Sequence, residues 1–157
     1  MIKLTHKEEE ANLVTHAGVF HADDVFATAF LELLKKDVVI MRVSELKDFS
    51  FPFNTLIYDI GNGEYDHHQE NAQKRTNGIK YSSFGLLFKK FGYNFLEKEG
   101  KIPKDLIDDV FLGLDQNFIM AIDAIDNGVF PKIEAIYKVK TVSDIIKSFN
   151  PAYDSKQ

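Results

Sequence analysis

Cysteine is absent from the 157 residues of this sequence. Its absence excludes a disulfide framework, a thiolate metal site and a cysteine nucleophile. Any metal ion bound by this chain must therefore be held by histidine, aspartate or glutamate side chains.

Basic residues are in deficit, since 19 Lys and Arg stand against 24 Asp and Glu and give a formal net charge of -5. This balance argues against a protein that holds nucleic acid mainly through a basic surface, because such binding depends on Lys and Arg neutralising phosphates. It leaves open a phosphate substrate at a metal-filled pocket, because bound divalent ions reverse the local potential of an acidic cleft.

Long apolar runs are missing as well. The charged segment 1–12 lacks the apolar core of a secretory signal, and no stretch approaches the length of about 20 residues that spans a membrane. We therefore expect a cytoplasmic protein that makes no membrane contact.

An apolar content of 45% at this length predicts a single domain over residues 1–157.

The order of apolar segments predicts the fold class. Residues 13–15, 37–43 and 55–61 are apolar enough to be buried strands, and a helix capped by Asp23 is predicted between the first two. Strand, helix, strand order implies parallel pairing. The sequence therefore predicts an α/β fold with a doubly wound, mainly parallel sheet and helices on both faces.

The rest of the chain is predicted to be a long functional loop followed by helices. Residues 62–80 are polar and contain Gly and Asn, which is typical of a loop. Apolar residues at helical spacing then predict helices over 84–91, 103–127 and 142–149, with Gly92, Gly128 and Pro151 as stops.

Four of the five histidines fall into two tight groups, and each group follows a predicted strand. Ligands collect at the carboxyl ends of strands in an open parallel sheet, so the topology can bring the two groups together. A lone His beside Gly is more often a structural loop residue, but two adjacent imidazoles offer little to stability. The groups are His16 with His21 and His67 with His68, accompanied by Asp23, Asp24 and Asp66.

A dinuclear metal site requires neutral imidazoles and carboxylates, one of which bridges two ions about 3.5 to 4 Å apart. Asp59, near the end of the third predicted strand, is the candidate bridging carboxylate and a catalytic residue. His16 and His21 would then serve one ion, and Asp23 and His67 the other.

The segment 122–128 supplies a further carboxylate, because Asp123 and Asp126 are three residues apart and share one helical face. We favour Asp126 as the ligand, because it is closer to the helix end marked by Gly128, and Asp123 as the residue that orients it. A solvated helix face is the alternative interpretation of this pair.

Two divalent ions in such a site lower the pKa of a shared water and clamp phosphoryl oxygens for in-line displacement. His68 is expected to hydrogen-bond a phosphate oxygen or to protonate the leaving group, and Asp66 is expected to orient the neighbouring ligands. Lys74, Arg75 and Lys80 would add charge for a longer substrate, with Arg75 as the substrate-binding candidate. An ordinary solvated face is the competing interpretation of these three residues.

Four segments together resemble one family. They are Thr-His-Ala-Gly-Val-Phe-His-Ala-Asp-Asp at 15–24, Tyr-Asp-Ile-Gly at 58–61, Tyr-Asp-His-His-Gln at 65–69 and Ile-Asp-Ala-Ile-Asp-Asn-Gly at 122–128. Their order and spacing resemble the MYG family, the melanocyte proliferating gene product and its relatives, often labelled metal-dependent protein hydrolases. That family resembles a branch of the Asp-His-His (DHH) phosphoesterase superfamily, which includes manganese pyrophosphatases, single-strand exonucleases and nanoRNA hydrolases.

The resemblance implies the fold of a DHH N-terminal domain and two divalent ions, Mn²⁺ or Mg²⁺. His21 stands where the superfamily usually has Asp, which shifts the expected preference toward Mn²⁺ or another transition metal. Carried over by motif, one ion is held by His16, His21 and Asp59, and the other by Asp23, Asp59, His67 and Asp126, with His68 toward the phosphate.

The activity implied by the resemblance is a metal-dependent phosphodiesterase or 3′ to 5′ exonuclease that acts on RNA or short oligonucleotides. A small-molecule phosphatase such as a pyrophosphatase is one alternative, and a non-catalytic metal-binding or interaction module is another. MYG proteins resemble a two-lobed chain about twice as long, so we expect the second, substrate-gripping lobe to be absent. Association into a homo-oligomer or with another subunit is a further expectation.

Overall fold

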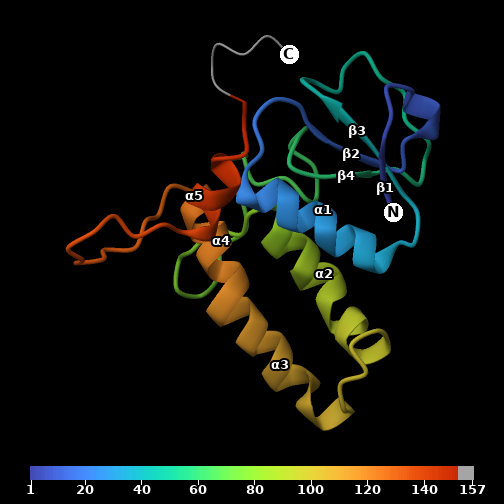
Figure 1. Cartoon of the computed structure of the whole chain (residues 1–157). Helices are drawn as coiled ribbons and strands as arrows, with labels where there is room; N and C mark the ends of the chain where they lie inside the picture. Colours follow the sequence, from blue (N-terminus) through green and yellow to red (C-terminus); the bar gives the residue numbers. More distant parts are fainter. Residues whose placement is uncertain (152–157) are drawn as a thin grey trace.

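Four parallel strands form the sheet of this protein, whose computed structural model describes residues 1–151 (Figure 1). All three strand pairs are parallel. The α/β class and the parallel pairing expected from the sequence are therefore confirmed, and the arrangement is consistent with a doubly wound fold. The strands are β1 (Ile2–Leu4), β2 (Leu13–His16), β3 (Val38–Val43) and β4 (Leu56–Ile57), in the spatial order β1-β3-β2-β4.

Two of the three predicted strands match β2 and β3, and the third is shorter than expected. Regular pairing in β4 stops at Ile57, and Tyr58 makes an isolated bridge with Tyr65 before the chain turns at Asp59. The strand β1 has no counterpart in the sequence prediction, because its three residues are exposed and form no apolar run.

The two faces of the sheet are covered differently. Helices α1 (Ala22–Leu34) and α2 (Ser83–Lys98) pack against each other over one face, with Phe30 and Phe84 in the core between them (Figure 1). On the other face, where the sequence also predicted helices, Val14 packs against Leu46 and Phe51 from the loop that follows β3. Leu13 and Val14 point to opposite faces because side chains alternate along a strand.

Residues 103–126 form a nearly continuous helical rod, as predicted. It consists of the 3₁₀ turn η2 (Lys104–Leu106), α3 (Ile107–Leu114), the π-helical turn η3 (Asp115–Ile119) and α4 (Met120–Asp126). After a projecting loop comes α5 (Val142–Lys147), and the 3₁₀ turn η1 (Glu8–Glu10) precedes β2. Nowhere in residues 1–151 is a helix both long and apolar enough to cross a bilayer.

The start of α1 differs from the prediction. The helix begins at Ala22 with His21 at its N-cap, and the Asp24 carboxylate accepts the His21 N–H at 2.9 Å. Asp23 lies in the first turn, so the prediction that it caps α1 is wrong. Its buried carboxylate is drawn instead to backbone N–H groups at the start of α2, which burial would otherwise leave without partners.

Candidate metal centre

The candidate metal centre lies at the carboxyl ends of β2 and β4, beside the first turns of α1 and α2. A parallel sheet gathers the loops that follow its strands at this edge, which is why residues far apart in the sequence meet there. The structure brings together all six side chains predicted as metal ligands: His16, His21, Asp23, Asp59, His67 and Asp126.

Asp59 lies between two imidazoles. Its Oδ2 is 3.2 Å from His16 Nε2, and its Oδ1 is 3.5 Å from His67 Nδ1. The residue has a φ of 56°, a left-handed conformation that the short polar side chain of Asp tolerates better than most. This turn ends β4 early and aims a buried carboxylate into the gap between the histidines. A carboxylate that bridges two metal ions requires such a position.

His16 offers one ring nitrogen to the centre. Its Nδ1 is 2.9 Å from the Ala17 carbonyl, which fixes the ring and leaves Nε2 facing the carboxylates. Nε2 lies 3.3 Å from Asp24 and 3.2 Å from Asp59. It is buried and has no well-aligned hydrogen-bond partner within residues 1–151. The carboxylate of Asp24, followed by that of Asp59, raises the pKa of His16 to about 10.

His21 lies next to His16, with ring centroids 5.4 Å apart. Both histidines line a cavity of about 380 Å³ together with Asp59, Asp66 and His68. The first predicted ligand group therefore faces a space in which a small substrate and an ion can be held.

Asp23, His67 and Asp126 form the second group, in which one ligand atom of each residue lies within 4.8 Å of the others. His67 Nε2 is 2.9 Å from Asp126 Oδ2, and its Nδ1 is 3.9 Å from Asp23 Oδ2. Burial raises the pKa of Asp23, and the charges of Asp59 and Asp126 raise it further. Carboxylates crowded in this way repel one another, and a divalent cation among them would neutralise that repulsion.

Two serines that sequence reasoning missed hold these carboxylates. The Ser82 hydroxyl lies 2.5 Å from Asp23 Oδ1, and the Ser83 hydroxyl donates to Asp59 Oδ1 at 3.2 Å. The backbone N–H groups of Ser83 and Phe84 donate to Asp23 at 3.0 and 2.7 Å. Serine at the N-cap position, which Ser82 occupies before α2, is a usual signal of a helix start and could have drawn attention to both residues.

Asp24 and Arg42 connect the centre to β3. Asp24 Oδ2 is 3.3 Å from Arg42 Nη2, and Arg42 Nε donates to the His16 carbonyl at 3.0 Å. No role was predicted for Asp24 beyond its place beside Asp23. No local sequence pattern marks Arg42 as part of the site. The register of the sheet, which pairs Arg42 with Thr15, is what places it beside Asp24.

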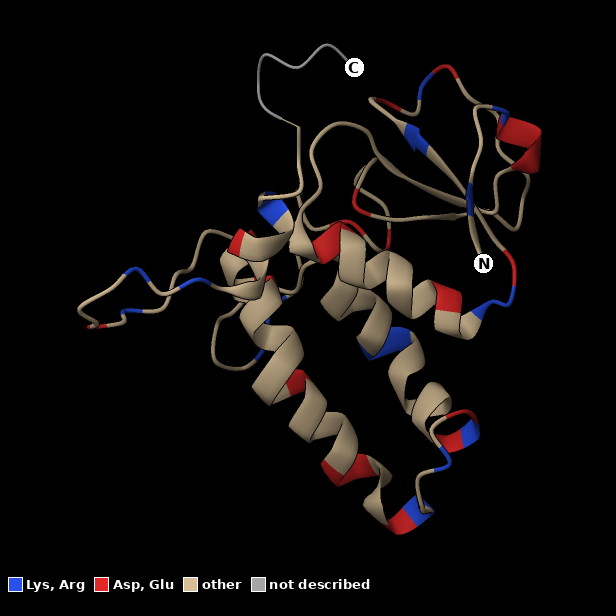
Figure 2. Ribbon diagram, in the orientation of Figure 1, with Lys and Arg blue, Asp and Glu red and all other residues tan. Residues whose placement is uncertain are grey.

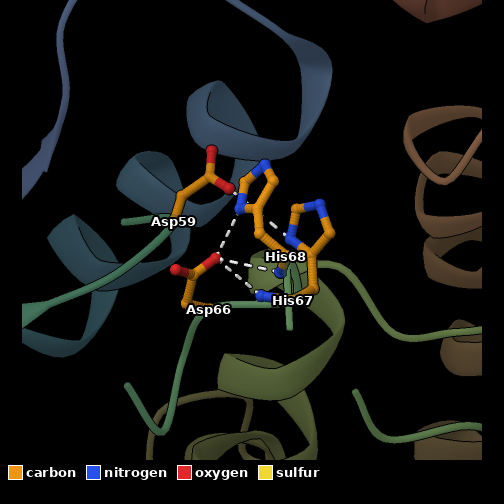
Figure 3. A group of neighbouring side chains, drawn as sticks. All are labelled: Asp59, Asp66, His67 and His68. Carbon is orange, nitrogen blue, oxygen red and sulfur yellow. Dashed lines mark hydrogen bonds and ion pairs between the residues drawn. The ribbon is translucent and has the colours of Figure 1, made fainter. Parts of the chain in front are cut away.

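Asp66 holds the loop that carries the adjacent histidines (Figure 3). Its Oδ1 accepts the backbone N–H groups of His67 and His68 at 2.7 and 3.3 Å and lies 2.5 Å from His68 Nδ1. Its Oδ2 accepts the Asn62 N–H at 2.7 Å. Both oxygens are thus occupied, which favours an orienting role over direct metal ligation. The His68 side chain is 61% exposed, and its ring stacks on His67 at 4.3 Å.

Arg75 and Asp123 pair with each other behind the ligands. Arg75 Nη2 is 2.6 Å from Asp123 Oδ2 and 2.5 Å from Asp115 Oδ1, and the guanidinium lies over the Tyr81 ring. Asp123 also accepts from the Ser82 hydroxyl at 2.5 Å. With a side-chain exposure of 6%, Arg75 is committed to structural partners, and its placement does not support the predicted contact with substrate.

The residues present fit a divalent metal centre. Imidazole nitrogens suit Zn²⁺ and Fe²⁺, and carboxylate oxygens suit Mg²⁺ and Mn²⁺, so a mixed set of the two fits a divalent transition metal. The buried Nε2 of His16 without a hydrogen-bond partner and the crowded carboxylates around His67 are both features that a bound cation would satisfy.

Comparisons with known proteins place this donor set in a family context. A family model named MYG1_exonuc, described as Uncharacterised protein family (UPF0160), matches residues 12–157. The chain is 30% identical over 175 residues to the MYG1 protein of Saccharomyces cerevisiae, covering 98% of this chain and 51% of that protein. It is 28% identical over 162 residues to the human MYG1 exonuclease, covering 89% of this chain and 42% of that protein.

A third relative, a MYG1 protein of Caenorhabditis elegans, is 31% identical over 132 residues, covering 73% of this chain and 38% of the relative. The chain therefore spans about half the length of the curated relatives it matches, or less. No solved structure matches the chain.

Proposed function

This chain belongs to the MYG1_exonuc family, and from that premise we propose that it is a divalent-metal-dependent phosphoric ester hydrolase acting on RNA or short oligonucleotides. The resemblance to the MYG family that the sequence motifs carry is confirmed by this membership. Its human and rat relatives bear the name exonuclease, which supports a nucleic-acid substrate for this family.

The observation that carries the proposal is the position of Asp59. Its two oxygens are directed at different imidazoles, Oδ2 at His16 and Oδ1 at His67. A carboxylate that served only to cap a turn would have no reason to lie buried between two histidines. This geometry supports a centre with two metal ions in which Asp59 is shared.

The remaining ligands divide on either side of Asp59. We assign His16 and His21 to one ion, and Asp23, His67 and Asp126 to the other. Two divalent ions in these positions would supply an activated water and a positive clamp on the phosphoryl oxygens. Mn²⁺ is our choice of metal, because a site with this many imidazoles is softer than an all-oxygen site.

The protein side chains around the ligands would orient substrate and move protons. His68 has an exposed ring whose Nδ1 is fixed by Asp66, so its Nε2 is free to meet a phosphate oxygen or a leaving group. We propose this as its catalytic role. The DHH-type mechanism, the 3′ to 5′ direction and the cytoplasmic location belong to the same proposal.

Two alternative functions use the same centre. A pyrophosphatase or other small-molecule phosphatase needs the ligands but no surface for a polymer. A metal-binding interaction module needs the ligands but turns over no substrate. Substrate choice separates these three possibilities.

The test is hydrolysis of a labelled short RNA, of pyrophosphate and of a chromogenic phosphodiester, each with Mn²⁺ and with a chelator. Wild type is compared with Asp59→Asn and His67→Gln, and with Asp109→Asn as a matched control at an exposed position of α3. Loss of a residue that hydrogen-bonds a metal ligand typically lowers metal affinity or activity by about 10- to 100-fold. Loss of the shared ligand itself should therefore lower the hydrolysis rate by more than about 100-fold.

Mn²⁺-dependent RNA cleavage that survives in Asp109→Asn and disappears in the other two variants supports the proposal. Cleavage of pyrophosphate alone would replace it with the small-molecule phosphatase. Tight metal binding without turnover of any of the three substrates would leave the interaction module.

A further inference from the structure

A second hollow adjoins the metal centre on the side of α5. It has a volume of about 300 Å³, and its lining includes His21 and Asp126, one from each proposed ligand group, as well as Phe130 and Lys147. His21 also lines the metal-centre cavity, so the two spaces meet at this residue. A substrate whose reacting phosphate lies at the centre would extend directly into this hollow.

A third hollow continues the second along the loop of residues 129–141. Its volume is about 320 Å³, and Tyr137 and Lys138 are among its lining residues. The second and third hollows share Phe130, Thr141 and Asp144. The three spaces are therefore neighbours, since each shares at least one lining residue with the next. We refer to the second and third together as the track.

Lysines gather along the track although the chain as a whole is acidic. Residues 129–147 contain four lysines, Lys132, Lys138, Lys140 and Lys147, against two acidic residues, Glu134 and Asp144. Lys138 and Lys147 are the two of these lysines that line the track. Figure 2 shows several blue segments, which mark Lys or Arg, on the loop that projects from the body of the protein. Over the whole sequence the formal charge is -5. The local surplus of positive charge is complementary to a chain of phosphates.

The wall of the track is held in place by specific hydrogen bonds. The Asp144 carboxylate accepts both the N–H and the hydroxyl of Thr141 at 2.8 Å, so this acidic side chain is used to cap α5. Asn150 Oδ1 accepts the Phe20 N–H at 2.6 Å, and its Nδ2 donates to the Phe20 carbonyl at 2.8 Å. These bonds fix α5 against the loop that carries His21.

Two aromatic rings in the track are turned toward solvent. Phe130 is 69% exposed and Tyr137 is 72% exposed, so both rings are open to contact with a ligand. Aromatic rings beside lysines are the usual platform for unpaired bases, because every base has a face that can stack. In a duplex these faces are already stacked on neighbouring bases, so the track fits a single strand.

We propose that the track binds single-stranded nucleic acid, with Phe130 and Tyr137 stacking on bases and Lys138 and Lys147 pairing with phosphates. The strand would run along the loop and α5 and end at the metal centre. This inference rests on the proposed function and adds the surface by which the protein selects a polymer over pyrophosphate. RNA and DNA share the required chemistry, and the test includes both.

The experiment measures fluorescence anisotropy of labelled single-stranded RNA, single-stranded DNA and duplex with the full chain and a chelator, so that binding is read without turnover. The variants are Phe130→Ala, Tyr137→Ala and Lys138→Gln. Phe53→Ala and Lys98→Gln are matched controls, because both side chains are exposed and lie outside the track. RNA cleavage with Mn²⁺ is measured in parallel for wild type and all five variants.

Each aromatic substitution should weaken single-strand binding by about fivefold or more, and Lys138→Gln should reduce the salt dependence of binding by roughly 0.7 in the logarithmic slope. The controls should bind like wild type. A preference between RNA and DNA within this pattern would identify the ligand and support the track.

Equal binding by wild type and all track variants, or tighter binding of duplex than of single strands, would overturn the proposal. If wild type cleaves RNA and the three substitutions do not change the rate, the proposed track is overturned and the proposed function is supported. Single-strand binding that depends on the track, without hydrolysis of any phosphate ester, would keep the track and remove the proposed function.

Discussion

Replacing Arg75 by glutamine is expected to destabilise the fold and to leave substrate affinity unchanged. The Arg75 guanidinium reaches Asp123 at 2.6 Å, and its Nε donates to Asp115 at 2.9 Å. Asp123 is fully buried, with 0% exposure, and burial raises its pKa, although Ser82 and Arg75 oppose this effect. Glutamine would leave that carboxylate in the interior without its cation.

The magnitude follows from the burial of the pair. Removal of one partner of a buried ion pair costs about 3 to 5 kcal/mol. Glutamine keeps one hydrogen-bond donor, and Asp115 retains 16% exposure, so we expect the lower end of this range, about 3 kcal/mol. In a domain of this size each kcal/mol lowers the melting temperature by about 2 to 4 °C, which gives a decrease of roughly 6 to 12 °C.

The assay is urea unfolding of the metal-free protein, with Lys98→Gln as an exposed control. The double variant Arg75→Gln with Asp123→Asn should recover part of the loss, because a neutral amide no longer needs a cation. An Arg75→Gln protein with the unfolding free energy of wild type and a raised KM for RNA alone would refute this reasoning and restore the substrate-binding role.

Three further predictions follow from the site and its supports. The pKa of His16 is about 10 in the metal-free protein, so below that pH its ring carries a proton that a metal ion must displace. Mn²⁺ affinity should therefore rise with pH by up to about tenfold per pH unit for each proton released. Calorimetry in buffers of different ionisation enthalpy should detect this proton release. An affinity independent of pH would exclude His16 as a ligand. Gly85→Ala would place a methyl group against the Asp123 carboxylate, so it should destabilise the protein by roughly 1 to 3 kcal/mol. Gly113→Ala meets open space on α3 and should stabilise the protein by about 0.5 to 1 kcal/mol. Equal urea midpoints for the two variants would contradict the packing described around Gly85. Asp66→Ala removes the acceptor that orients the loop of adjacent histidines, and it should lower Mn²⁺ affinity by about 10- to 100-fold in competition with a fluorescent chelator.

The sequence contained enough information for the main elements of the fold. The apolar runs at 13–15 and 37–43 marked strands because both are buried in the sheet. The helical periodicity of 103–127 persisted through the π-helical turn, which does not interrupt the rod. The strand β1 was missed because it is held by pairing with β3 and not by burial of its own side chains.

The clustering of the proposed ligand side chains was also predictable, because metal-binding chemistry in a chain without Cys limits the choice to His, Asp and Glu. Their supports were not predictable from local pattern. The pairing of Asp24 with Arg42 depends on strand register, and the capture of Asp23 by Ser83 depends on how α1 and α2 meet. Arg75 was assigned to substrate because a sequence does not show that a guanidinium is buried against two carboxylates.

The most direct test of the account is a titration of the metal-free protein with Mn²⁺, followed by electron paramagnetic resonance. If Asp59 joins two ions, wild type and the Asp109→Asn control should bind two Mn²⁺ per chain and give a spin-coupled signal, and Asp59→Asn should lose that coupling. A single uncoupled ion in wild type, or coupling that persists in Asp59→Asn, would contradict the claim that this carboxylate bridges a two-metal centre.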